Sequence, residues 1–529
     1  SVQAYETANA LYERYHFPDF NVVNALYKPL GNHYTRLGDN EKALAVFQKA
    51  LALGGEPEML AGLYGNIGIA YWNAGGMPAA EDNCRKGLAL SGISKAKQAL
   101  LQSVLALVEL DTGRPGPARQ TAAKALQLLP SPVSGDDQRW EERARIRRTA
   151  GLACARSGHF AEARRLLEGA LSDALRASGN SGNRDIGKIQ LAFSEVYLLQ
   201  NQPLKALEAS NGALEAVLPA FHPKRIEANP DPADFYEENT ISESLIAKAA
   251  AANAMFNQSG ELRWLQLALE CHDLAHAVEA RLRAVFQYES SKLGLQSGAR
   301  QREEAAMQIC RQLYERTGLA IYLEKGFEIA ERTEAAVLLE ALRDNLIGQK
   351  LRNNPQYKML STLRQTAAWY RKQLILEPQN EMAGQWRSDL DELTGRINTL
   401  RNSIPELNRL EAAASKHPGT PPGTFSSGEN WVEYFVGAQF VEIFSGKGTT
   451  ASAWNRLPND EVLQVQVQKF QSFFSNASAI LNDPAGYLQT AFLLHQKLLP
   501  DAIPASTQLL IIPDGFTHFI PFEALVTEM

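Results

Sequence analysis

One stretch of the chain decides how the rest is read: residues 24–57, NALYKPLGNHYTRLGDNEKALAVFQKALALGGEP. Apolar and small residues recur in it at spacings of three and four, which is the period of an α-helix. Gly38 and Asp39 interrupt the pattern, so the stretch predicts two helices joined by a turn. Gly31 and Ala43 are small enough to let the two helix backbones approach closely, while larger residues such as Phe47 pack around the contact.

The same pattern returns four more times. The position of Gly31 is taken by a small residue in each later unit, at intervals of 37 to 45 residues: Gly68, Ala106, Gly151 and Ser194. One helix pair cannot bury its apolar face alone, but stacked pairs share a continuous core. The pattern resembles the tetratricopeptide repeat (TPR), a helix pair of about 34 residues. The resemblance implies a right-handed superhelix whose concave groove holds a protein or peptide.

Changes of pattern predict the domain organisation. The fold class is expected to be mainly α, and its parts are a TPR superhelical array over residues 1–345, an antiparallel helical hairpin over 346–414, a linker over 415–429 and a small, incomplete α/β segment over 430–529. Within the array, three prolines in residues 222–240 forbid a continuous helix. That segment is either a plain connection or a flap over the groove.

The last hundred residues change from helical to strand periodicity. Residues 431–436 and 440–444 predict a β-hairpin, and two helices follow at about 459–475 and 484–499. The apolar run 508–512 predicts a strand covered on both faces.

The motif LLIIPDGFTHFIPFEAL, residues 509–525, resembles a signature of the CHAT domain, a caspase-like and separase-like cysteine peptidase domain found behind TPR arrays. ENWVEYFVG resembles the opening strand of that domain, and FEIAERTEAAVLLEALRD resembles the segment that leads into it. The resemblance covers nearly the whole chain. It implies the recognition and regulatory region of a TPR–CHAT peptidase, a kind of protease that acts in bacterial defence by cutting one partner protein.

The catalytic half of that family is not visible in this sequence. Its His-Gly and Ser-Ala-Cys motifs do not occur, so we predict no catalytic residue and assign no chemical role to His518. About three strands are too few for a covered parallel sheet. We therefore expect a fragment truncated before the catalytic half and inactive by itself, with the missing C-terminal CHAT half as one partner. The alternative is a non-enzymatic TPR scaffold or adaptor for protein–protein interaction.

Four residues are candidates for binding a partner in the groove. Lys28, Asn32 and Asn66 resemble part of the carboxylate clamp of chaperone-binding TPR proteins, in which a lysine and amides hold the C-terminal carboxylate of a peptide. Arg36 on the same first helix joins them. The third repeat departs from the clamp, because Leu100 and Val104 stand where cations are needed. A chaperone-tail adaptor is therefore a third possible function.

Composition limits the other classes of function. The chain has 529 residues, 45% hydrophobic and 21% charged, and a net charge of −6, so it carries no electrostatic footprint for nucleic acid. No cofactor is expected, no stretch suits a membrane span, and a cytoplasmic location is the default expectation. The four cysteines fall in predicted helices, where cysteine packs as a small apolar group.

Two short motifs have competing interpretations. Cys271, His272 and His276 are either half of a metal site or packing and surface residues of a helix; we expect the latter and predict no metal. Residues 445–450, SGKGTT, are similar to the end of a phosphate-binding loop, but the required glycine and hydroxyl positions fail. A hairpin turn is expected there.

Overall fold

Paired antiparallel helices make up the first part of the chain. The structure, a computed structural model, describes residues 2–129, 137–179, 182–285, 289–376, 429–499 and 509–528, apart from positions 16, 18, 449, 476 and 477, together with individual residues between 382 and 410. The chain divides into two compact units, Ser1–Arg302 and Glu303–Met529. The division falls inside one long helix. The predicted end of the array at residue 345 stays a prediction.

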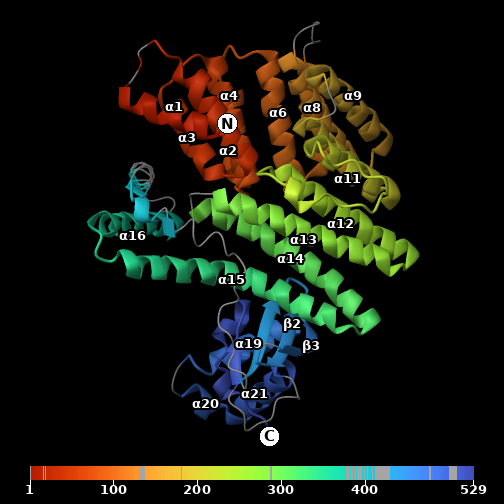
Figure 1. Ribbon diagram of the computed structural model, residues 1–529, viewed down its shortest axis with the longest axis vertical. Coiled ribbons are helices and arrows are strands. Elements are labelled where there is room, and N and C mark those ends of the chain that lie inside the picture. Colours follow the sequence, from red (N-terminus) through yellow and green to blue (C-terminus); the bar gives the residue numbers. More distant parts are fainter. Residues whose placement is uncertain are drawn as a thin grey trace. The chain divides into compact units, whose positions relative to one another are not determined.

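The first unit consists almost entirely of helices, and the predicted fold class is confirmed. In chain order they are α1 (Val2–Tyr15), α2 (Lys28–Leu37), α3 (Asn40–Ala52), α4 (Pro57–Asn73), α5 (Met77–Leu88), α6 (Lys95–Asp111), α7 (Pro115–Leu128), α8 (Asp137–Arg156), α9 (Phe160–Ser178), α10 (Arg184–Leu199), α11 (Pro203–Val217), α12 (Asn239–Ser259), α13 (Leu262–Val285) and the start of α14 (Glu289–Thr317) (Figure 1). Each even-numbered helix from α2 to α12 packs against the helix that follows it. Each of these first helices also contacts the first helix of the next pair, from α2 to α12.

The small residues bring each first helix close to its own second helix. A β-carbon on Gly31 would stand 2.4 Å from Cε1 of Phe47 on α3, so only glycine fits there. The Ser194 hydroxyl of α10 donates to the Ala206 carbonyl of α11 at 3.0 Å. All five matched positions are buried: Gly31, Gly68, Ala106, Gly151 and Ser194. The five predicted helix pairs are therefore confirmed.

The proline-containing segment after α11 is a connection held against the helices around it. Lys248 of α12 is fully buried and donates to the Ala228 carbonyl. Arg281 of α13 donates to the Phe235 carbonyl at 2.7 Å, and the Tyr236 hydroxyl donates to the carbonyl of Val217 at 2.7 Å. These contacts favour the plain connection over the flap.

The second unit opens with long helices. It contains the rest of α14, α15 (Ala320–Leu351) and α16 (Pro355–Leu376). Leu351 and Leu360 share one buried cluster with Ile404 and Leu407. The chain after α16 therefore returns against it, as the predicted hairpin requires. The predicted linker, up to residue 428, lies outside the described residues.

A four-stranded mixed sheet follows in the order β3-β2-β1-β4. Its strands and the neighbouring helices are β1 (Asn430–Val436), β2 (Phe440–Lys447), β3 (Thr450–Pro458), α19 (Glu461–Ser472), α20 (Ala479–Asn482), α21 (Pro484–Leu498) and β4 (Leu509–Ile512). β2 is antiparallel to β1 and to β3, whereas β4 is parallel to β1, with Val432 opposite Ile511. The predicted hairpin across residues 437–439 is confirmed.

Helices cover both faces of this sheet because its strands are apolar on both sides. On one face Val432 and Tyr434 share a core with Leu463 of α19 and Leu494 of α21. On the other face Trp431 stacks on Phe327 of α15, with ring centroids 4.8 Å apart. Trp454 of β3 stacks on Tyr314 of α14 at 5.5 Å.

Two expectations about the sheet need correction. Strand β3 was not predicted, and the turn expected at residues 445–450 is the tight connection that leads into it. The expectation that 508–512 is a strand covered on both faces is wrong: β4 stands at the edge of the described sheet, and Leu510 is 44% exposed. An apolar edge of this kind can pair with another strand.

The four cysteines lie inside helices, are buried and form no disulfide with one another. Burial raises the pKa of Cys84 and Cys271 to about 12 and that of Cys154 to about 11. These three thiols remain protonated at neutral pH and pack as apolar groups. In the part of the chain that the structure describes, no helix is both long and apolar enough to cross a bilayer.

Candidate functional site

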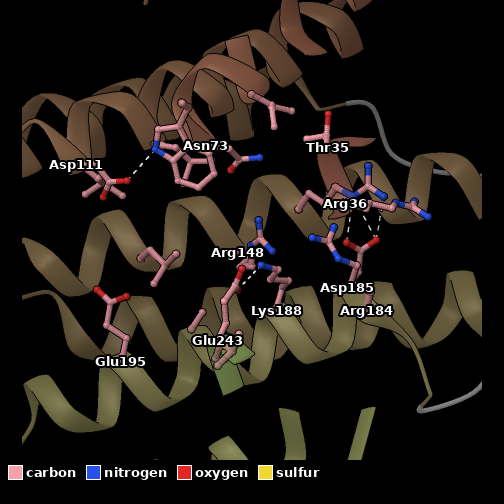
Figure 2. Close-up of a pocket in the computed structure, with 18 of the residues that line it drawn as sticks. Thr35, Arg36, Asn73, Asp111, Arg148, Arg184, Asp185, Lys188, Glu195 and Glu243 are labelled. Carbon is pink, nitrogen blue, oxygen red and sulfur yellow. Dashed lines mark hydrogen bonds and ion pairs between the residues drawn. The ribbon is translucent and has the colours of Figure 1, made fainter. Parts of the chain in front are cut away.

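The first helices of six consecutive pairs line one cavity of about 660 Å³ in the first unit (Figure 2). This volume lies in the range of ligand pockets. The lining combines apolar side chains with charged and amide groups. Its lining comes from α2, α4, α6, α8, α10 and the start of α12, and includes Asn32, Thr35, Arg36, Asn66, Ile69, Trp72, Asn73, Leu107, Leu110, Asp111, Glu141, Arg145, Arg148, Leu152, Arg156, Asn183, Arg184, Asp185, Lys188, Leu191, Ala192, Glu195 and Glu243.

The repeat register explains why these side chains meet. The residue one position after the small residue of each first helix faces the cavity: Asn32, Ile69, Leu107, Leu152 and Glu195. The residue four positions further on does the same in the first four helices: Arg36, Asn73, Asp111 and Arg156. The small residue fixes which helix face turns to the partner helix, and the next face along the helix therefore lines the cavity.

A row of polar contacts crosses one side of the cavity from helix to helix. The Trp72 indole of α4 donates to Asp111 of α6 at 2.7 Å. Arg156 of α8 pairs with Asp111 at 2.8 Å and with Glu195 of α10 at 2.6 Å. The hydrogen bonds that Arg156 donates to Glu195 and to Asp111 raise the pKa of Arg156. We call this row the ladder (Trp72, Asp111, Arg156 and Glu195).

A second set of ion pairs joins α8, α10 and α12. Arg145 of α8 donates to Asp185 of α10 at 3.0 Å. Burial alone would raise the pKa of Asp185, but the adjacent Arg145 charge brings it below its usual value. Lys188 of α10 pairs with Glu243 of α12, and Arg184 pairs with Glu238 at 2.9 Å.

Three donors at the cavity have no protein partner among the described residues. Nε of Arg148 is buried and donates no hydrogen bond, and Nδ2 of Asn66 is likewise buried and unbonded. Arg36 is exposed at the rim and makes no ion pair. Burial lowers the pKa of Arg148, opposed mainly by the charge of Asp185. Figure 2 shows Arg148 beside Lys188 and Glu243, with Arg36 on one side and Glu195 on the other.

The structure brings together three of the four predicted partner-binding residues. Asn32, Arg36 and Asn66 line the cavity, whereas Lys28 lines a separate depression together with Lys97 and Glu58. Burial and the neighbouring Lys97 lower the pKa of Lys28. A clamp built on Lys28 together with Asn66 is therefore not assembled in one cavity.

Sequence reasoning missed the cations of α8 and α10. A spacing of three and four residues connects Glu141, Arg145, Arg148, Leu152 and Arg156, which places them on one helix face. That signal was available in the sequence. The clamp pattern concerns the first three repeats, whereas these cations lie on the first helices of the fourth and fifth repeats.

Across the described residues, no group of three or more His, Cys, Asp and Glu side chains is arranged to hold a metal ion. Cys271 instead contacts Oδ1 of Asn229 at 3.3 Å, inside the connection after α11. The cavity itself carries hydrogen-bond donors and ion pairs, and its described lining offers no nucleophile paired with a base.

Comparisons with known proteins give a limited likeness. No family model matches this sequence, and no curated protein matches it. Among solved structures, BtubC from P. vanneervenii is 17% identical, covers 48% of this chain and 93% of its own, and gives a TM-score of 0.31. YrrB, a TPR protein described as having an unusual peptide-binding site, is 20% identical. The match covers 41% of this chain and 93% of YrrB, with a TM-score of 0.22.

A TPR repeat-containing protein from Cytophaga hutchinsonii is 13% identical and covers 68% of this chain and 98% of its own, with a TM-score of 0.24. Scores and identities of this size carry no argument about function. The repeat architecture therefore stands on the packed small residues and helix pairs of this chain.

Proposed function

We propose that the first unit is a repeat scaffold that binds an extended segment of a partner protein in the cavity. The observation that carries this proposal is the cavity of about 660 Å³ between consecutive first helices, with buried donors that have no partner within the described chain. Unbonded buried donors cost stability, and a ligand that accepts hydrogen bonds would satisfy them.

The lining supports a peptide over a small rigid molecule. Ile69, Leu107 and Leu152 provide apolar surface in a line across three helices, and polar groups flank that line. An extended peptide presents apolar and polar side chains alternately, and its backbone supplies carbonyl acceptors.

Selection of peptides on the full 529-residue chain tests this function. Peptides from a displayed random library would be enriched on the immobilised chain and then measured against two variants. Asn73→Trp fills the exposed rim of the cavity, and Lys124→Trp places the same side chain on α7, outside it. We expect Asn73→Trp to abolish binding and Lys124→Trp to preserve it. Enriched peptides that bind both variants equally would contradict the proposal.

A second function, the recognition region of a TPR–CHAT cysteine peptidase, is favoured by the second unit. The Pro-Asp-Gly motif after β4 is anchored to the end of β1, since Asp514 accepts from the backbone N–H of Val436 at 2.7 Å. Asp514 and Thr517 also form a reciprocal cap at the start of the turn that follows. The motif that resembles the CHAT signature thus fixes β4 beside β1, with β4 at the edge of the described sheet.

The coding sequence downstream of the Met529 codon tests this second function. His-Gly and Ser-Ala-Cys motifs after predicted strands would support a peptidase, and the protein containing them should cleave a partner captured by the cavity. A continuation without both motifs would leave the non-enzymatic scaffold.

A further inference from the structure

We infer that the cavity of the first unit contains an anion subsite centred on Arg148, which binds a carboxylate of an acidic peptide. The inference deepens the proposed function and rests on it. The subsite is distinct from the predicted clamp, because Arg148 lies on α8 and Lys28 lies outside the cavity.

The carboxylates near Arg148 are already engaged by other cations. The carboxylates of Asp185 and Glu243 act on Arg148 with opposite charge. Asp185 accepts from Arg145 at 3.0 and 3.2 Å, and Glu243 pairs with Lys188. Arg148 is therefore left as a guanidinium whose Nε is buried and unbonded.

A buried cation without an anion destabilises a folded chain. Arg145 and Arg184 also act on Arg148 with like charge. Each is paired with another carboxylate, Asp185 and Glu238 respectively, so Arg148 is the cation of this group without an ion pair among the described residues. A guanidinium presents donors in a planar fork that matches a carboxylate. A ligand carboxylate would satisfy the buried Nε and relieve this repulsion.

The lining carries both positively and negatively charged side chains, which favours a peptide over nucleic acid as the ligand. Asp111, Glu141 and Glu195 line the cavity together with the arginines. They would repel the continuous negative charge of a phosphate backbone, which needs an extended basic surface. A peptide with one carboxylate at a defined place avoids them and can still contact Ile69, Leu107 and Leu152.

Retention of defined peptide pools on the immobilised 529-residue chain tests the inference. One pool has glutamate at the centre of nine otherwise randomised positions and an amidated C-terminus. A second has glutamine at the centre. A third has the central glutamine and a free C-terminus, so that a terminal carboxylate is distinguished from a side-chain carboxylate. Oligo-dT of matched length serves as the nucleic-acid probe.

We expect the glutamate pool or the free-carboxylate pool to be retained about tenfold more than the amidated glutamine pool. Arg148→Gln should remove this preference. The matched control is Arg165→Gln, an exposed arginine on α9, the second helix of the same pair, and it should keep the preference. Equal retention of all three pools, with loss of all three in Asn73→Trp, would overturn the anion subsite and leave the peptide-binding function intact.

Two other results are equally decisive. If no pool is retained, or if Asn73→Trp retains every pool, the proposed function fails together with the inference. If oligo-dT binds more tightly than the glutamate pool and depends on Arg148, the ligand is a nucleic acid and the inference is overturned. A thermal unfolding scan confirms that each variant is folded, and Arg148→Gln is expected to unfold at the same temperature as the parent or higher.

Discussion

The ring of Phe47 occupies the space that a side chain on Gly31 would need, with Cε1 only 2.4 Å from the position of a β-carbon. This contact sets the distance between α2 and α3, and the four other small positions are buried in the same way. We predict that Gly31→Ala destabilises the chain by about 1–3 kcal/mol, because the ring has to move. Chemical denaturation of the full chain measures the change.

Gly116→Ala is the control for that experiment. Gly116 lies within α7, and a β-carbon there would meet no atom within 4 Å. Alanine is the better helix former, but Gly116 precedes Pro117, whose ring disfavours the helical region for a residue with a β-carbon. Replacing Gly116 should therefore change stability by less than about 1 kcal/mol in either direction. Equal losses from both substitutions would mean that the close contact at Gly31 is unimportant.

Asp185→Asn should weaken the fold and strengthen anion binding at the same time. The wild-type carboxylate holds Arg145 at 3.0 Å, so its removal leaves Arg145 with the longer contact to Glu141 at 3.4 Å. We expect a loss of about 1–3 kcal/mol and tighter retention of the glutamate pool. Because the pKa of Asp185 is lowered in the folded state, its stabilising effect is present above the unfolded pKa and is lost as pH falls.

The loss of stability at acidic pH tests the contribution of Asp185. Unfolding measured between pH 3 and 7 should show a smaller acid-induced loss of stability in Asp185→Asn than in the parent chain. An identical acid profile in the two proteins would count against the ion pair with Arg145.

Lys248 should make stability rise at alkaline pH. Burial lowers its pKa to about 8, with Cys271, Glu227 and Glu270 acting in the opposite direction. The folded chain therefore releases this proton more readily than the unfolded chain, so stability increases as pH rises from 8 towards the usual lysine pKa. At about 1.4 kcal/mol per pKa unit, the rise is on the order of 3 kcal/mol.

Lys248→Met should remove that rise, although it also removes the donor to the Ala228 carbonyl. Lys124→Met is the control, because Lys124 is exposed on α7 and should keep the parent profile. Unfolding by urea between pH 7 and 10.5 compares the three proteins. Above about pH 9 the buried thiols of Cys84, Cys154 and Cys271 lower the stability of all three proteins, because their pKa values are raised. The test is therefore the difference between the parent and Lys248→Met, and parallel profiles in these two proteins would refute the assignment.

Glu331 should make the stability of the folded chain fall as pH rises, at lower pH than the effect of Lys248. Burial raises its pKa, and a hydrogen bond with Glu433 of β1 only partly offsets this. The folded chain holds the proton more firmly than the unfolded chain, so stability falls as pH rises through the folded pKa. Glu331→Gln should keep its stability over the same range, whereas Glu324→Gln, exposed on the same helix, should behave as the parent.

The repeat core could be predicted from sequence because it depends on local spacing. Gly31 and Ser194 each occupy the small position of a helical pattern, and the contact they make is with the next helix of the same pair. Strand β3 could not be predicted with the same confidence, because Thr450 is its one β-branched residue. Its place depends on side chains distant in sequence, such as the hydrogen bond from Trp454 to Glu442 at 2.9 Å.

The candidate site was predicted in part for a related reason. The face that carries Arg148 can be read from spacing within α8. Whether that arginine has a partner depends on Asp185 and Glu243, which come from two other helices. These carboxylates pair with Arg145 and Lys188 instead. Local periodicity predicts which side chains face the cavity. The contacts between helices, which the sequence does not show, decide which charged side chain has no ion-pair partner.

The ladder that joins Trp72, Asp111, Arg156 and Glu195 has a mechanical consequence. It connects four successive first helices along one surface. Bending the repeats apart there would therefore break this hydrogen bond and these ion pairs one after another. Counterions weaken contacts between charges. The scaffold should therefore resist a pulling force more strongly in dilute buffer than in concentrated salt, and the same side chains that shape the cavity would set how stiffly it is held open.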